Sequence, residues 1–216
     1  MTQVKICCIS SIQEAKMAIE NGANILGLVG PMPSGPGIIS NEQIAEIAQS
    51  VPTHIYTWLL TSETSAEKII AHYNLVNTNA IQIVDKLKKD EYQKIKDTLP
   101  GIKLIQVLHV LDESTIDEAR RIAKYVDYIL LDSGNPKGDI KILGGTGNVH
   151  NWEISKKVVN SVEVPVFLAG GLNGKNVVAA IGKVQPFGVD LCSGVRTENR
   201  LDHIKLKSFF QNIRTM

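Results

Sequence analysis

The sequence has few cysteines, few aromatic residues and almost no excess of charge. It holds only three cysteines, two of them adjacent at Cys7 and Cys8, so we expect no disulfide framework and a reducing, cytoplasmic compartment. No zinc-type spacing of cysteine and histidine occurs, so no metal site is expected. The 23 basic and 22 acidic residues leave a formal charge of +1, which argues against nucleic acid as a partner.

Long apolar runs are also missing. None approaches the roughly 18 residues that a transmembrane helix needs, and the first residues lack the apolar stretch of a signal peptide. We therefore expect no membrane partner. The 216 residues, 44% of them hydrophobic, are enough for one full core, and no linker or low-complexity segment divides them. We expect a single domain over residues 1–216.

The dominant pattern is a regular alternation of short apolar runs and longer stretches with helical spacing. The apolar runs, rich in Val, Ile and Leu, are almost continuously hydrophobic, as parallel strands covered by helices are. Expected strands are 4–9, 25–29, 55–60, 80–84, 103–110, 128–131, 164–169 and 188–192. Expected helices are 11–21, 41–49, 65–73, 90–99, 114–124, 151–161, 173–183 and 201–213.

Eight strand–helix units in a chain of this length predict an α/β fold, a single-domain (β/α)₈ TIM barrel. An open doubly wound sheet is the competing architecture. It rarely needs eight such regular units, and no G-x-G-x-x-G motif follows the first strand. Two long connections, 30–37 and 133–147, fall at carboxyl ends of strands, where barrels carry their active sites. By length and position, the first is equally well a rigid surface loop or a substrate-covering loop.

Glycines gather at the ends of the last three expected strands. Glycine lets the backbone approach a ligand closely, and barrels often hold phosphate with the loops after strands 7 and 8. Tight turns alone would also explain single clusters, but three on one face favour a phosphate site. The candidate phosphate-binding residues are Gly145, Gly147, Gly170, Gly171, Ser193 and Gly194.

Two side chains at strand ends could transfer protons. Cys7 ends the first strand and shares a face with Lys5, whose positive charge favours a thiolate, so Cys7 is a better candidate base or nucleophile than Cys8. Asp132 ends the sixth strand, where it is either a cap or an acid across the barrel mouth. Spacing alone does not pair the two. Asp190, inside a strand, is expected to be a polar barrel residue bonded to a neighbour. The five histidines form no motif, and each is expected to be structural or on the surface.

An ordered set of motifs resembles the phosphoribosylanthranilate isomerases of tryptophan biosynthesis along nearly the whole chain. The opening KICCIS is similar to that family's Lys-Ile-Cys-Gly-Ile-Thr, and NGANILG to its Gly-Ala-Asp-x-Leu-Gly segment. Each motif alone is weak, but the order is specific. The remaining matches are LLD at 130–132, GGTG at 144–147 before Trp152, AGGLN at 169–173, and PFGVD with SGV at 186–195.

The resemblance implies an isomerase without metal or cofactor that performs an Amadori rearrangement on a small phosphoribosyl substrate. It implies that Cys7 is the general base at C2′ and that Asp132 is the general acid at the ring oxygen. The glycine loops and Lys5 would bind the substrate and its phosphate. Barrels of this size are monomers or homodimers, and the sequence does not decide between them.

Four departures from the family pattern concern the anthranilate side. Cys8 replaces a glycine, the loop at 34–37 reads SGPG where the family carries an arginine, and 82–85 reads QIVD in place of Gln-Leu-His-Gly. Arg196 replaces a glutamate and is a candidate contact for the aglycone. The alternatives are therefore a paralogue that isomerises a different phosphoribosylamine and a non-catalytic phosphosugar-binding barrel.

Overall fold

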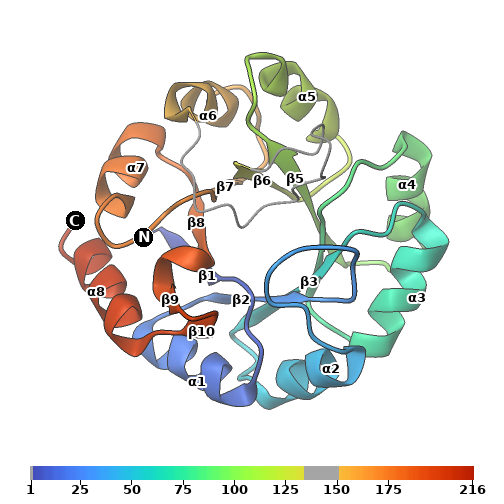
Figure 1. Cartoon of the computed structure of the whole chain (residues 1–216). Helices are drawn as coiled ribbons and strands as arrows, with labels where there is room; N and C mark the ends of the chain where they lie inside the picture. Colours follow the sequence, from blue (N-terminus) through green and yellow to red (C-terminus); the bar gives the residue numbers. More distant parts are fainter. Residues whose placement is uncertain (1, 134–150) are drawn as a thin grey trace.

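The chain folds into a closed barrel of eight parallel strands. The structure, a computed structural model, describes residues 2–133 and 151–216. Neighbouring strands pair in sequence order, and β1 pairs with β8 to close the ring, as Figure 1 shows. This confirms the predicted TIM barrel and excludes the open sheet. The strands are β1 (Gln3–Ile6), β2 (Ile25–Val29), β3 (Tyr56–Thr61), β4 (Ala80–Ile83), β5 (Lys103–His109), β6 (Tyr128–Asp132), β7 (Val166–Leu168) and β8 (Gly188–Leu191).

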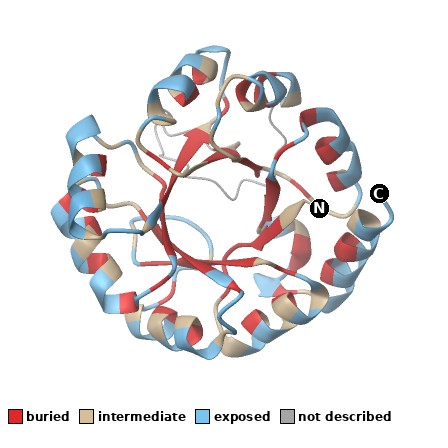
Figure 2. Cartoon of the chain, turned by 180° about the vertical axis from the view of Figure 1, so that it is seen from behind, coloured by how far each residue is buried: buried red, intermediate tan, exposed pale blue. Residues whose placement is uncertain are grey.

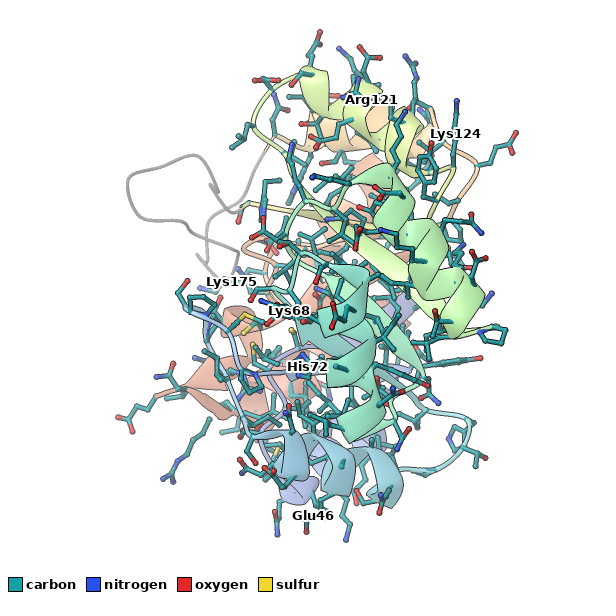
Figure 3. The ribbon with its side chains drawn as sticks, turned by 90° about the vertical axis from the view of Figure 1, so that its right-hand side faces the viewer. Glu46, Lys68, His72, Arg121, Lys124 and Lys175 are labelled. Atoms are coloured by element: carbon teal, nitrogen blue, oxygen red, sulfur yellow. The ribbon has the colours of Figure 1, made fainter. Side chains whose placement is uncertain are left out.

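The helices surround the barrel and bury one face each against the strands. Figure 2 shows the strands buried and the helices buried only on their inner side. Glu46, Lys68 and Arg121 lie on the exposed outer faces of helices, and Lys124 is exposed in the turn after one of them (Figure 3). The helices are α1 (Ile12–Asn21), α2 (Asn41–Ser50), α3 (Ala66–Val76), α4 (Lys89–Thr98), α5 (Ser114–Ile122), α6 (Trp152–Val159), α7 (Val177–Val184) and α8 (His203–Arg214). Among the described residues, no helix is long and apolar enough to cross a membrane.

Element boundaries follow local chemistry that the hydrophobic pattern does not carry. The first strand ends at Ile6, three residues earlier than predicted, and Cys8 then has a left-handed backbone with φ 62°. The seventh helix begins at Val177 rather than at 173, because Asn173 and Asn176 form a turn in which the Asn176 side chain accepts from the Asn173 backbone. Beyond β8, the short helix η1 (Ser193–Val195) and the two-stranded ribbon β9 (Arg196–Thr197) and β10 (Arg200–Leu201) were not predicted.

Aromatic side chains fill the barrel at the amino-terminal ends of its strands. Trp58 lies 5.0 Å from Phe167 and 5.8 Å from Tyr128 between ring centroids, and Phe167 lies 5.6 Å from Phe187. Such tilted and edge-on pairs pack densely and fill this end of the barrel with side chains. Trp58 is therefore a packing residue, and the cavity described below lies at the opposite end of the barrel.

Candidate active site

A cavity of about 740 Å³, including its mouth, opens at the carboxyl ends of the strands. This is the face where parallel barrels carry their ligands. Each of the eight strands gives the cavity a lining side chain or a residue directly after its end, and so does the loop after β2, which Figure 1 shows in blue beside β3. The lining residues that matter below are Cys7, Cys8, Ser34, Gln82, Asp132, Gly170, Gly171, Asp190, Cys192 and Ser193.

The two adjacent cysteines both reach this cavity. Cys7 is held by a hydrogen bond from its backbone N–H to the Leu191 carbonyl, which continues the ladder between β1 and β8. Cys8 would point outward if the strand continued, but its positive φ turns its thiol toward Cys192, with 2.8 Å between the two sulfur atoms. A non-glycine residue reaches this backbone region at some cost in free energy. The thiol that replaces glycine thus finds its room through a backbone conformation that glycine favours.

Directly below Cys7 lies a buried ion pair. Lys5 Nζ is fully buried and lies 2.8 Å from Asp190 Oδ2 on the neighbouring strand. A Cβ atom at Gly27 would lie 2.9 Å from Lys5 Nζ and 3.0 Å from Cys7 Sγ, so the ammonium and the thiol share the space that this glycine leaves free. Asp190 is therefore the bonded barrel residue that we expected. Lys5 lies beneath the cavity and outside its lining, whereas we expected it to contact the substrate.

The surroundings of Cys7 favour its thiolate. The neighbouring Cys8 thiol lowers the pKa of Cys7 as a hydrogen-bond donor; burial opposes this, and the positive charge of Lys5 lowers the pKa further. Burial by itself would lower the pKa of Lys5, but the carboxylate of Asp190 reverses this and raises it. Lys5 thus remains a fixed cation under the sulfur. This arrangement suits a base that must exist as an anion.

Asp132 lies across the cavity at the end of β6 with the opposite tendency. Burial raises the pKa of Asp132 to about 6, and the backbone N–H of Ser133, 2.7 Å from Oδ1, only partly offsets this. A carboxyl group with such a pKa holds its proton near neutral pH far more often than an ordinary aspartate. The cavity therefore combines a thiol with a lowered pKa and a carboxyl with a raised one. Groups whose pKa values are pushed apart in this way are typical of acid–base pairs.

The glycines after β7 and β8 form one edge of the cavity. Gly170 and Gly171 line it, and both have positive φ, 83° and 64°. Ser193 also lines it, while Gly194 lies behind, where a Cβ atom would collide with the backbone carbonyl of Leu172. This close approach brings the two strand-end loops together, as a phosphate cradle requires. The other two candidates, Gly145 and Gly147, lie outside the described residues.

Arg196 occupies a different place from the one that we expected. Its guanidinium lies 3.0 Å from Glu14 of α1 and donates to the backbone carbonyls of Cys7 and Cys8 at 3.2 Å and 2.5 Å. It is absent from the described lining of the cavity. Arg196 thus fixes the backbone that carries the thiols, and its donors are not directed at the aglycone of a substrate. The sequence pattern predicts neither the ion pair with Glu14 nor the hydrogen bonds to the two carbonyls.

Of the histidines that the structure describes, the most buried is structural, as expected. His72 of α3, marked in Figure 3, is hydrogen-bonded on both sides of its ring. Nδ1 lies 3.1 Å from the Thr61 hydroxyl oxygen, and Nε2 lies 3.0 Å from Oδ1 of Asn41. Burial lowers its pKa, which favours the neutral ring. A Cβ atom at Gly30 would collide with this ring, so the histidine fixes the start of the loop after β2.

Comparison with known proteins decides the family. The sequence model of the family described as N-(5′-phosphoribosyl)anthranilate (PRA) isomerase matches residues 4–212. The chain belongs to this family. It is thus an isomerase of the phosphoribosylanthranilate isomerase group, with the family's barrel. The opening Cys7 segment, the Asp132 strand end and the glycine loops all fall inside the matched residues.

Relatives of this isomerase family align along their full length. The N-(5′-phosphoribosyl)anthranilate isomerase of Methanocella arvoryzae is 31% identical over 215 residues, which are 99% of each chain. The solved phosphoribosyl anthranilate isomerase of Thermotoga maritima is 29% identical, with a TM-score of 0.86 and full coverage of both chains. A further solved isomerase of the family holds reduced 1-(o-carboxyphenylamino)-1-deoxyribulose 5-phosphate; it is 27% identical, with a TM-score of 0.83 and full coverage of both chains.

One residue of this isomerase that sequence reasoning missed is Gln82 on β4. Its side chain is buried at the cavity, and Oε1 has no hydrogen-bond partner within residues 2–133 and 151–216. The neighbouring Gln106 points away from the cavity and is fully bonded, to Tyr92 and to backbone carbonyls. Buried amides are normally satisfied, so an unpartnered one beside a cavity suggests a ligand contact. In the sequence, only alternation along the strand distinguishes these two glutamines.

Proposed function

We propose that this chain converts N-(5′-phosphoribosyl)anthranilate to its 1-deoxyribulose 5-phosphate isomer by an Amadori rearrangement. The observation that carries the proposal is that Cys7 and Asp132 line one cavity with oppositely shifted pKa values. Their strands, β1 and β6, lie far apart in the ring, so the two groups approach a bound sugar from different directions. The chemistry needs one proton delivered and one removed, which is what this pair can do.

Ring opening is the first step. The protonated carboxyl of Asp132 donates its proton to the ring oxygen of the ribose, and the bond between C1′ and that oxygen breaks. The lone pair of the aromatic amine forms the C1′–nitrogen double bond, which leaves a cationic iminium. The pKa of Asp132, about 6, keeps a useful fraction of the acid protonated near neutral pH.

Proton removal from C2′ is the second step. The thiolate of Cys7 takes this proton, and the released electron pair moves through C1′ to neutralise the nitrogen, which gives an enolamine. The enol hydroxyl at C2′ then loses its proton and C1′ gains one, so the product is the ketone. Lys5 supports this step from below, because its fixed positive charge stabilises the sulfur anion before the proton arrives.

The phosphate of the substrate belongs on the glycine edge. Gly170 and Gly171 allow close approach of the backbone, and Ser193 adds a hydroxyl at the same edge. Gly145 and Gly147 would complete the cradle from the loop after β6. Anchoring the phosphate there fixes which carbon faces Cys7. Each proposed step is driven by proton transfer to or from the chain's own groups, so the proposal needs no cofactor. We propose a monomeric or homodimeric enzyme of the cytoplasm.

A fluorescence assay tests the activity. Phosphoribosylanthranilate is generated in situ, and its consumption is followed with the wild-type chain, Cys7→Ala and Asp132→Asn. Each substitution removes one proton-transfer group, so we expect kcat to fall by about 10²–10⁴-fold. Turnover close to wild type in either variant would overturn the assigned roles. No turnover by the wild-type chain would overturn the substrate.

A second candidate activity is the same isomerisation on a phosphoribosylamine with a different aglycone. It is favoured by the cavity side formed by β2–β5, where the described lining residues carry no charge that could bind a carboxylate. The loop there contributes Ser34, Gly35 and Pro36 in the region where relatives of the family place an arginine. A panel of phosphoribosylamines separates the candidates: strict preference for anthranilate would exclude the second.

A further inference from the structure

All three cysteines of the chain gather at one point of the fold. Cys7 and Cys8 follow β1, and Cys192 follows β8, the strand that closes the barrel against β1. The sulfur atoms of Cys8 and Cys192 lie 2.8 Å apart, although 184 positions separate the residues in sequence. Both side chains line the cavity that contains Cys7. The three sulfur atoms therefore form one cluster at the mouth of the barrel.

The Cys8 thiol is held opposite Cys192 by its surroundings. The backbone of Cys8 is left-handed, which directs its side chain toward the seam between β1 and β8. On its other side lies Gly37, where a Cβ atom would come within 2.5 Å of Cys8 Cβ. The thiol also lies 3.5 Å from the Pro36 carbonyl, to which it donates. Cys8 is buried in the apolar cluster that also holds Cys7, and its left-handed backbone places its sulfur atom directly opposite a second thiol.

We propose that Cys8 and Cys192 form an oxidisable dithiol, a modification site that a peroxide converts to a disulfide beside Cys7. Cys192 is the partly exposed member, whereas Cys8 is buried. The oxidant therefore meets Cys192 first, and Cys8 is the resolving thiol. Hydrogen bonds with Cys192 and Cys7, together with burial, raise the pKa of Cys8 well above its ordinary value, which keeps it protonated until then.

The reaction balances with one peroxide. The Cys192 thiolate attacks a peroxide oxygen, the O–O bond breaks, and a sulfenic acid and hydroxide result. Cys8 then attacks this sulfur; the S–S bond forms, the S–O bond breaks, and the departing hydroxide takes the Cys8 proton as water. Two thiols and one hydrogen peroxide thus give one disulfide and two water molecules. The two electrons pass from the sulfur atoms to the peroxide oxygens.

The disulfide would change the environment of Cys7. The Cys8 thiol is the hydrogen-bond donor that lowers the pKa of Cys7, and a disulfide has no proton to donate. Oxidation would also join the first and last strands of the barrel covalently, since Cys8 and Cys192 lie on the two sides of their seam. The dithiol itself does not depend on the proposed function; only its effect on Cys7 as a base does.

The test uses the full chain with Cys7→Ala, which leaves only Cys8 and Cys192. After treatment with equimolar hydrogen peroxide, we expect loss of both titratable thiols, a mass lower by two hydrogens, a tryptic cross-link between the Cys8 and Cys192 peptides, and full reversal by dithiothreitol. Because the cross-link closes a very long loop, we also expect the melting temperature to rise by roughly 5–10 °C.

Matched variants in the same background are Cys8→Gly, which suits the left-handed backbone, and Cys192→Ser. Neither should form the intramolecular cross-link, and neither should gain melting temperature on oxidation. Two thiols that remain free in the Cys7→Ala chain, or cross-links only between chains, would overturn the proposal. None of these readouts uses turnover, so failure here is distinct from failure of the isomerase activity.

Discussion

The two sides of the cavity differ in almost every property that matters for catalysis. The side formed by β6, β7, β8 and β1 brings the acid Asp132, the thiol Cys7 above its buried ion pair, and the left-handed turn at Gly170 and Gly171. The side formed by β2–β5 is neutral among the described residues, with Val29, Met32, Leu60, Gln82, Val84 and Val107. The first side matches a sugar phosphate that gains and loses protons. The second side offers a ligand apolar contacts and one amide oxygen, Gln82 Oε1, that has no hydrogen-bond partner among the described residues.

The largest expected effect concerns the ion pair on the charged side. Lys5→Met leaves Asp190 buried without its cation, so we expect the free energy of unfolding to fall by about 3–5 kcal/mol in urea denaturation. In addition, iodoacetamide should alkylate Cys7 only at higher pH, because the charge that stabilises its thiolate is gone.

The control for this prediction is the double variant Lys5→Met/Asp190→Leu. It should regain much of the stability, since no buried charge remains, but its alkylation profile should stay shifted. Alkylation is measured with Cys8→Gly and Cys192→Ser in both chains, so that only Cys7 reacts. If the profile does not move, Lys5 has no influence on Cys7 and the charged side owes its reactivity to something else.

Two glutamines on adjacent strands of the neutral side make the next test. Gln106→Met removes bonds to Tyr92 and to the Ile83 and Asp85 carbonyls, so we expect a loss of about 2–3 kcal/mol in chemical denaturation. Gln82 Oε1 has no hydrogen-bond partner among the described residues, so Gln82→Met loses no bond at that atom and should stay within about 0.5 kcal/mol of wild type. A Gln82 variant as unstable as the Gln106 variant would show that Gln82 is structural.

The charge of buried Asp132 should destabilise the fold once the pH exceeds about 6. Its pKa rises from 3.8 unfolded to about 6 folded, so the folded state holds the proton more tightly, and stability falls as pH rises through this window. Asp132→Asn avoids the buried charge, and we expect a gain of about 1–2 kcal/mol at pH near 8. Thermal or urea unfolding across pH checks this: the gain should vanish below the unfolded pKa, and a pH-independent gain would contradict the assigned cause.

The smallest expected effect comes from adding charge to the neutral side. Ser34 lies exposed at the cavity in the loop after β2, and Ser34→Arg introduces a fork suited to a carboxylate. An exposed contact of this kind is worth about 1 kcal/mol, so we expect KM for phosphoribosylanthranilate to fall by about 3–10-fold with kcat unchanged. Ser34→Lys is the matched control, with charge but no fork. An unchanged KM in both would mean that the aglycone carboxylate lies elsewhere.

The sequence predicts the fold because the alternation of strand and helix patterns is local. The same logic predicts that Cys7, Asp132 and the Gly170 turn share one face, because parallel strands of a barrel all end there. The resemblance then supplies the roles that spacing leaves open. The pattern does not predict contacts between residues far apart in the sequence. Lys5 contacts Asp190 across 185 positions, and Arg196 contacts Glu14 across 182.

Backbone conformation is the second thing that the pattern does not carry. Cys8 continues an apolar run, which predicts an extended strand to residue 9, yet its positive φ ends the strand and redirects the thiol. From the sequence, Arg196 is likewise expected to be a charge available to a ligand at the cavity. Nothing in the sequence shows that its guanidinium is hydrogen-bonded to two backbone carbonyls and paired with Glu14. Both errors concern a side chain whose partners come from the opposite end of the chain.

The seam between β1 and β8 has a consequence for synthesis on the ribosome. Cys7 emerges well before Asp190, which lies below it in the barrel, and before Arg196, which lies behind it, because nearly the whole barrel separates them in sequence. A nascent chain of seven strand–helix units therefore carries its base without the carboxylate that fixes Lys5 or the guanidinium that holds the thiol-bearing backbone. Catalytic competence arrives in a single late event, when the final strand docks and the ring closes.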